Sequence, residues 1–205
     1  MLPLESGLAV LVPEAEHLVR PFREEHDPSA AAGMPAHITL LYPFKPPYEI
    51  CDSVMEKLNR CFAGFSSFDF SLAKICRFPG AILYLAPEPD EPFRRLTLAV
   101  WDYYQETPPY CGKYSNVVPH LTLAKLDNEQ QADQAAAEFA QASRGQLPIR
   151  VTASEIAPMD ADEELAGANH DPVELVCVGG RSRCRVARGL NETGRDPAAS
   201  LPPRL

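Results

Sequence analysis

One short pattern occurs twice in this 205-residue chain, each time inside a run of residues that is typical of a buried β-strand. The two copies are His37-Ile38-Thr39-Leu40 and His120-Leu121-Thr122-Leu123. Because side chains of a strand alternate between its two faces, His and Thr fall on one face and the aliphatic residues on the other. The pattern therefore predicts two strands that each present an imidazole beside a hydroxyl over an apolar back.

A single His-x-Thr carries little weight, because a partly buried, hydrogen-bonded histidine is the commoner interpretation. Two copies that are both followed by Leu are improbable by chance in a chain with five histidines. We therefore interpret His37 and His120 as a pair that acts together, with Thr39 and Thr122 beside them. The remaining histidines have no partner in the pattern and are expected at the surface: His17, His26 and His170.

Composition and charge restrict the class of protein. Lys and Arg number 19 against 28 Asp and Glu, and the resulting net charge of −9 disfavours non-specific binding to long nucleic acid. A small phosphate ligand remains compatible with this charge. The first residues lack the basic and apolar segments of a secretory signal, and no run approaches the length of a membrane span, so we expect a cytoplasmic monomer. The six cysteines show no close ligand spacing, which favours reduced thiols and no metal or cofactor.

The expected elements repeat in order: strand, helix, His-x-Thr strand, helix, strand. Hydrophobic periodicity predicts strands at 8–12, 36–42, 68–75, 81–86, 119–126, 147–156 and 173–178, and helices at 14–25, 52–62, 90–105 and 128–141. The segments 27–35 and 160–168 are expected to be loops. We predict an α+β fold, duplicated and two-lobed, with antiparallel sheets lining a central cleft and helices outside. It would form one bilobal domain over 1–180, with repeats at about 7–78 and 81–178 and a flexible tail at 181–205.

The paired tetrapeptides, 83 residues apart in a duplicated α+β chain, resemble the two-histidine (2H) phosphoesterase superfamily. The segments HITLLYPF and PHLTLAKL are most similar to its 2′-5′ RNA ligase-like branch. The resemblance covers roughly residues 7 to 178. It implies metal-independent chemistry on a phosphodiester, commonly a 2′,3′-cyclic phosphate or a 2′-5′ linkage of a nucleotide or short RNA, in which ligation can be the reverse reaction.

Elementary chemistry agrees with this implication. Hydrolysis of a phosphodiester without metal needs a base, an acid and donors to the non-bridging oxygens. We expect His120 as base and His37 as acid, although the sequence does not fix which is which, and the hydroxyls of Thr39 and Thr122 as donors. Tyr42 and Lys125, each five places after a histidine, are weaker candidates for binding phosphate. By strict alternation they face away, so each needs a bulge or a strand end to reach the site.

Two other classes of function stay open. The same fold could bind a nucleotide as a sensor or scaffold without turnover, or the enzyme could act on a non-nucleic cyclic phosphate of a sugar or cofactor. Tyr48 and Tyr114, in proline-rich loops, could stack a base, although exposed loop tyrosines are commoner than base platforms.

Overall fold

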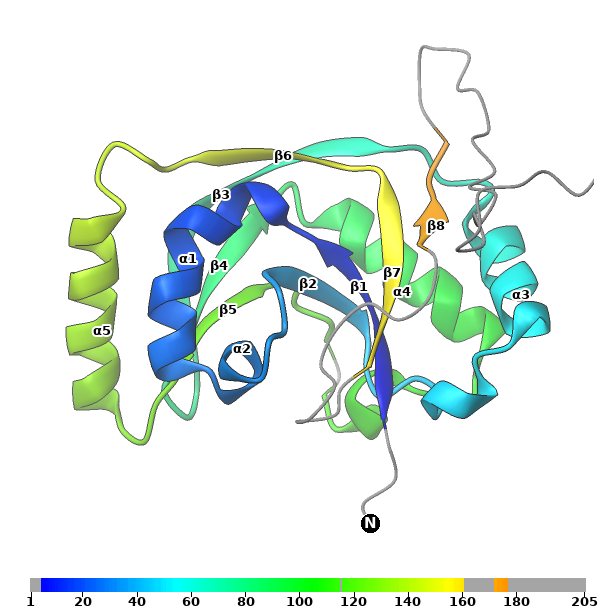
Figure 1. Cartoon of the computed structure of the whole chain (residues 1–205), viewed down its shortest axis with the longest axis horizontal. Coiled ribbons are helices and arrows are strands. Elements are labelled where there is room, and N and C mark those ends of the chain that lie inside the picture. The colour runs from blue at the N-terminus through cyan, green and yellow to red at the C-terminus, as the bar shows by residue number, and fades with distance from the viewer. Residues whose placement is uncertain (1–4, 115, 161–171, 177–205) are drawn as a thin grey trace, which may run out of the picture.

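The computed structural model describes residues 5–114, 116–160 and 172–176, and it contains two four-stranded sheets. The strand orders are β2-β1-β7-β8 and β5-β4-β3-β6, and neighbouring strands in both sheets are antiparallel (Figure 1). The predicted α+β class with antiparallel sheets is therefore confirmed. The strands are β1 (Ser6–Leu11), β2 (His37–Leu41), β3 (Phe68–Phe78), β4 (Ile82–Glu88), β5 (Leu121–Lys125), β6 (Ile149–Ala153), β7 (Glu155–Asp160) and β8 (Val173–Glu174). The helices are α1 (Pro13–His26), α2 (Pro28–Ala31), α3 (Asp52–Phe62), α4 (Glu91–Tyr103) and α5 (Glu129–Ala142), with short 3-10 turns η1 (Pro47–Glu49) and η2 (Pro109–Gly112).

Two of the expected elements are wrong. The segment 27–35 is not simply a loop, because it contains α2, whose first turn is capped by the Asp27 side chain accepting from the backbone N–H of Ser29. The strand expected at 147–156 is two strands, β6 and β7, which part at Ser154 and join different sheets. The last expected strand is shorter than predicted, since β8 covers only Val173–Glu174. The tail at 181–205 and nearly all of the loop at 160–168 lie outside the described residues.

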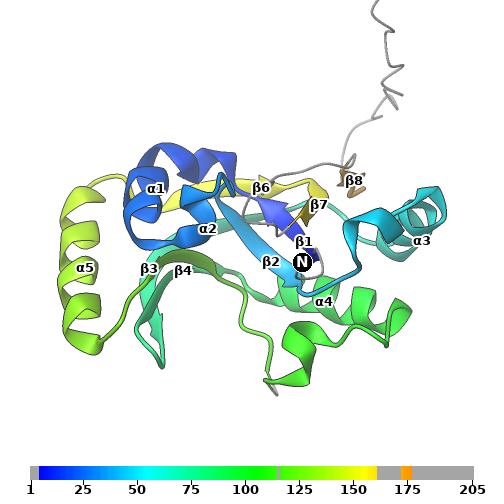
Figure 2. The ribbon, with the colours of Figure 1, turned by 60° about the horizontal axis from the view of Figure 1, so that its bottom comes forward.

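The two sheets do not coincide with the two sequence repeats. β3, which belongs to the first repeat, lies in the second sheet between β4 and β6, and β7 from the second repeat lies beside β1. The helices cross in the same way, because α1 packs against β5 and β6 while α4 packs against β2. The halves therefore interlock, and β2 and β5 are brought next to each other (Figure 2).

The apolar core joins both sheets. Phe93 of α4 packs edge-on against Phe68 and Phe70 of β3, with ring centroids 5.1 and 4.9 Å apart. Since α4 also lies behind β2, this aromatic cluster couples the first sheet to the second. Full burial of one such side chain contributes on the order of 1.5–3 kcal/mol. The Thr97 hydroxyl of α4 donates to the Leu40 carbonyl at 2.9 Å and fixes the helix against β2.

The expectations about cysteines and membrane spans can be compared with the structure within the described residues. Cys51, Cys61, Cys76 and Cys111 are free thiols, and Cys177 and Cys184 lie outside the described residues. Among the helices of residues 5–114, 116–160 and 172–176, none is both long and apolar enough to cross a membrane.

Candidate active site

The two His-x-Thr strands have the alternating faces that the sequence predicts. On β2, His37 and Thr39 are half-buried while Ile38 and Leu40 are buried. On β5, Thr122 is half-buried between buried Leu121 and Leu123, and half-buried His120 directly precedes the strand. Because β2 and β5 are neighbours in space, they bring the two imidazoles to the same region of the molecule.

Both imidazoles make the same kind of hydrogen bond to a backbone carbonyl. The Nδ1 of His37 lies 2.8 Å from the carbonyl oxygen of Pro35, and the Nδ1 of His120 lies 2.7 Å from that of Val118. A carbonyl oxygen only accepts, so Nδ1 carries the hydrogen and donates it. In the neutral ring Nε2 is then the free acceptor. The anchor two residues before each histidine thus leaves both Nε2 atoms for proton transfer.

The surroundings of the two rings lower the pKa of both. Burial lowers the pKa of His37 from 6.5 to about 4, and the positive charges of Arg23 and of His120 act in the same direction, against the Pro35 carbonyl and Asp27. Burial also lowers the pKa of His120, with Lys125 adding to the effect and the Val118 carbonyl opposing it. The two imidazoles are therefore close enough for their charges to interact, and Lys125 lies near enough to act on one of them.

A matching irregularity follows each Thr. The pairing of β1 with β2 shifts by one residue between Leu8 and Ala9, and that of β4 with β5 shifts between Leu83 and Tyr84. Each shift inserts one extra residue, Leu40 in β2 and Leu123 in β5, so that two successive residues are buried. The alternation is reset, and the next residue returns to the face of the His and Thr side chains. This is the bulge that Tyr42 and Lys125 require to reach the site.

Tyr42 and Lys125 nevertheless end in different environments. The ammonium of Lys125 lies 3.0 Å from Oδ1 of Asp27, at the edge of the site. The hydroxyl of Tyr42 donates to the carboxylate of Glu5, and burial together with that carboxylate raises the pKa of Tyr42 to about 12. The Tyr42 hydroxyl already has a partner, whereas Lys125 keeps two N–H groups for a ligand.

Several residues at the site were not identified from the sequence. Arg23 and Asp27 form a buried ion pair, and their charges act on His37. Phe78 and Tyr84 stack at 4.2 Å, and the ring of His120 stands edge-on to both, at 4.9 and 5.5 Å between centroids. The Asp-Pro dipeptide at 27–28 is a helix-cap signal that could have indicated Asp27. Phe78 was missed because β3 runs three residues beyond its predicted end.

The other predicted residues lie away from this group or outside the described ranges. Tyr48 and Tyr114 are 80% and 58% exposed, and Tyr114 packs edge-on against Tyr110, with ring centroids 5.7 Å apart. His17 is exposed on α1, as expected. The expectation for His26 is wrong, because its ring is half-buried, packs edge-on against Phe22 at 4.7 Å and lies 3.9 Å from Glu25. His170 lies outside the described residues. Within those residues, no three His, Cys, Asp or Glu side chains are grouped to hold a metal ion.

Comparisons with known proteins concern the family and the fold. A family model described as the 2′-5′ RNA ligase superfamily matches residues 11–164. Similar solved structures include LigT of E. coli complexed with 3′-AMP (15% identity, TM-score 0.52, 85% of this chain and 99% of that one) and in apo form (15%, 0.53, 85% and 98%). TT0787 of Thermus thermophilus is similar at 19% identity and a TM-score of 0.50, over 76% of this chain and 87% of that one. These structures share the fold. No curated protein matches the chain.

Proposed function

Because the chain belongs to the 2′-5′ RNA ligase superfamily, whose model matches most of its length, we propose that it is a metal-independent phosphodiesterase. Its substrate would be a 2′,3′-cyclic phosphate or a 2′-5′ linkage of a nucleotide or an RNA end. The observation that carries the proposal is the pair of imidazoles with the same backbone anchor and two free Nε2 atoms. The similar E. coli LigT has been solved with 3′-AMP, a nucleotide.

In hydrolysis, one imidazole takes a proton from water through Nε2 while the water oxygen forms a bond to phosphorus. The other imidazole gives the proton on its Nε2 to the departing ribose oxygen as that P–O bond breaks. The two rings exchange protonation states, and solvent restores them. Acid and base catalysis of this kind contributes roughly 10²–10⁴-fold for each group.

The unequal surroundings of the rings favour the reverse of the assignment that we expect from the sequence. A pKa of about 4 keeps His37 neutral over most of the working range, as a base must be. Burial lowers the pKa of His120 as well, and the acid role falls to this ring because His37 is the one held neutral. Pairs whose environments separate their pKa values divide the acid and base roles accordingly. We therefore assign His37 as base and His120 as acid in the hydrolytic direction.

The remaining groups would hold the phosphate oxygens. Thr39 and Thr122 present hydroxyls on the same faces as the two rings, and Lys125 adds a cation beside His120. Donors of this kind stabilise the charge that develops on the non-bridging oxygens in the transition state. Tyr42, whose hydroxyl donates to Glu5, does not take this role in our proposal.

The test is turnover of 2′,3′-cyclic nucleotides, 2′-5′ dinucleotides and 3′-5′ dinucleotides side by side, in excess EDTA. We expect one of the first two substrate classes to be cleaved at the same rate with and without the chelator. Loss of activity in EDTA that one divalent ion restores would contradict the mechanism. Tight binding of the nucleotides without turnover of any of them would instead indicate a non-catalytic binding protein.

A further inference from the structure

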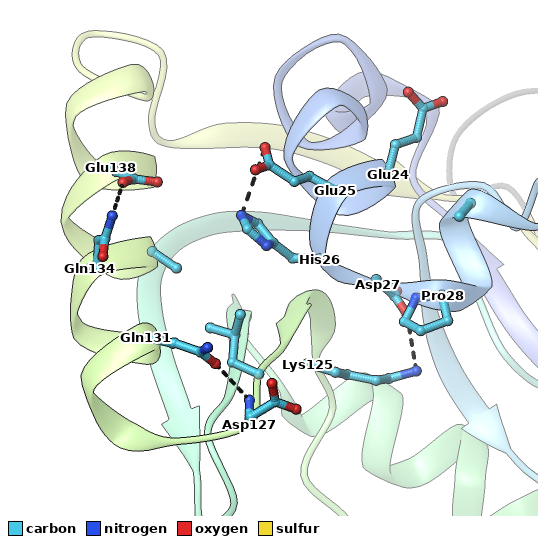
Figure 3. Close-up of a pocket in the computed structure, with 13 residues that line it drawn as sticks. Glu24, Glu25, His26, Asp27, Pro28, Lys125, Asp127, Gln131, Gln134 and Glu138 are labelled. Carbon is cyan, nitrogen blue, oxygen red and sulfur yellow. Dashed lines mark hydrogen bonds and ion pairs between the residues drawn. The ribbon is translucent and has the colours of Figure 1, made fainter.

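An ion pair connects the two halves of the molecule at the edge of the candidate active site. Asp27 lies at the junction of α1 and α2, and Lys125 is the last residue of β5, five places after His120. The Nζ of Lys125 lies 3.0 Å from Oδ1 of Asp27, as Figure 3 shows. The Asp27 side chain is 1% exposed, whereas that of Lys125 is 50% exposed. One partner is therefore fixed in the interior and the other can reach a ligand.

The carboxylate of Asp27 is held on both of its oxygens. Oδ1 accepts from the backbone N–H of Ser29 at 3.2 Å and from its hydroxyl at 2.8 Å, and Oδ2 accepts from Nη2 of Arg23 at 3.2 Å. Arg23 is itself anchored, because its Nη1 donates to the Met34 carbonyl at 3.2 Å. These bonds leave the carboxylate no freedom to rotate. It is a rigid acceptor for the ammonium of Lys125.

Other carboxylates share a pocket with this ion pair. Lys125 lies on the wall of a pocket of about 640 Å³ between α1 and α5, shown in Figure 3. Four further carboxylates line this pocket: Glu24, Glu25, Asp127 and Glu138. A lysine side chain is long and flexible, with a compact charge that can pair with any of several carboxylates. Without Asp27, the other carboxylates of the pocket would compete for the ammonium.

We propose that Asp27 is a positioning residue that holds the Lys125 ammonium at the candidate active site, where its two remaining N–H groups can bind a phosphate group. This inference rests on the proposed function, since it assigns Lys125 to phosphate binding. Arg23 supports the arrangement from the interior by fixing the second carboxylate oxygen. Asp27 acts through Lys125 and does not touch the substrate.

A double-mutant cycle tests the proposal, because only residues that act through each other lose their effects together. The probe is adenosine 3′-monophosphate, and its affinity is measured by isothermal titration calorimetry for the wild type, Asp27→Asn, Lys125→Met and the double variant. We expect Lys125→Met to weaken binding about tenfold and Asp27→Asn about three- to tenfold. The double variant should bind no more weakly than Lys125→Met alone.

Independent losses that multiply in the double variant would overturn the proposal, because they would mean that Asp27 acts through the fold or through His37 and not through Lys125. An unchanged affinity in Lys125→Met, or no binding of the probe by the wild type, would overturn it too. Asp133→Asn is the matched control, since it removes an exposed carboxylate 2.7 Å from Arg77 outside the site. It should leave the affinity within about twofold of the wild type.

Asp27→Asn leaves the Arg23 guanidinium buried without its counter-charge, which can unfold the protein. Arg23→Met/Asp27→Asn removes both charges and serves as the second background for the same cycle with Lys125→Met. Turnover of a 2′,3′-cyclic nucleotide by the same variants separates the two proposals. Coupled binding without turnover would reject the phosphodiesterase and retain the role of Asp27. Turnover that depends on both histidines, with independent losses of affinity in the cycle, would retain the phosphodiesterase and reject the role of Asp27.

Discussion

The strands that carry His37 and His120 share their local structure and differ in what packs against the imidazoles. Each ring donates from Nδ1 to the carbonyl two residues before it, and each strand has one extra residue after its Thr. Around His37, however, lie the buried charges of Arg23 and Asp27, whereas His120 stands against Phe78 and Tyr84. Because the backbone is shared in this way, both rings are anchored through Nδ1 and both keep Nε2 free. The different packing places the two rings beside different charges, which is how an acid and a base of one residue type are set apart.

The largest expected effect is on catalysis. His37→Ala and His120→Ala should each lower kcat/KM by roughly 10²–10⁴-fold, or about 3–5 kcal/mol of transition-state stabilisation, because each removes one proton-transfer group. Both variants should remain folded, as measured by circular dichroism. His17→Ala, on the exposed side of α1, is the control and should be fully active. Activity of either site variant within a few-fold of wild type would remove that histidine from the mechanism.

The second effect is on stability and concerns His37 more than His120. The pKa of His37 is about 4 in the folded chain against 6.5 when exposed, so between these values only the unfolded state binds the proton. Acidification from pH 6.5 to 4 should therefore cost the wild type about 2–3 kcal/mol through this one group, and none above pH 6.5. His37→Gln should lose that much less free energy of unfolding across the window, measured by urea denaturation at each pH. His120→Gln should change the pH dependence in the same direction. No change in the His37→Gln variant would contradict the burial of His37.

A smaller effect is expected for the hydroxyls. Thr39→Ala and Thr122→Ala should each lower kcat about three- to thirtyfold, because water partly replaces a lost donor to the phosphate oxygens. Thr152→Ala is a matched control from β6 in the same sheet as Thr122, where the hydroxyl donates to Asp69 at 2.6 Å. It should leave kcat unchanged. A loss in Thr152→Ala as large as in the site variants would indicate a general effect on the sheet.

The sequence predicts the parts of this site that depend on local pattern. Alternation places His37 and Thr39 on one face of β2, and hydrophobic spacing finds α1, α3, α4 and α5 to within about two residues but not the short α2. The resemblance to the family rests on the same two tetrapeptides. The need for a bulge before Tyr42 and Lys125 also follows from strict alternation, and both bulges are present.

The parts that it does not predict depend on long-range packing. Nothing local at Ser154 shows that β6 pairs with β3 while β7 pairs with β1, since both strands have ordinary strand composition. The partner of Lys125 is Asp27, 98 positions away, and the two meet only because α1 of the first repeat packs on the second sheet. The difference in pKa between the histidines likewise arises from burial and from charges that the fold brings together.

The most direct test of two-histidine catalysis is the pH dependence of kcat/KM for a 2′,3′-cyclic nucleotide. The rate should rise as His37 loses its proton, near pH 4, and fall as His120 loses its own, at a pH below the ordinary histidine value of 6.5. Both limbs report the coupled pair, and we predict a bell whose maximum lies below pH 6.5. A flat profile, or one that changes in a single direction from about pH 3.5 to 9 across the histidine range, would contradict the account.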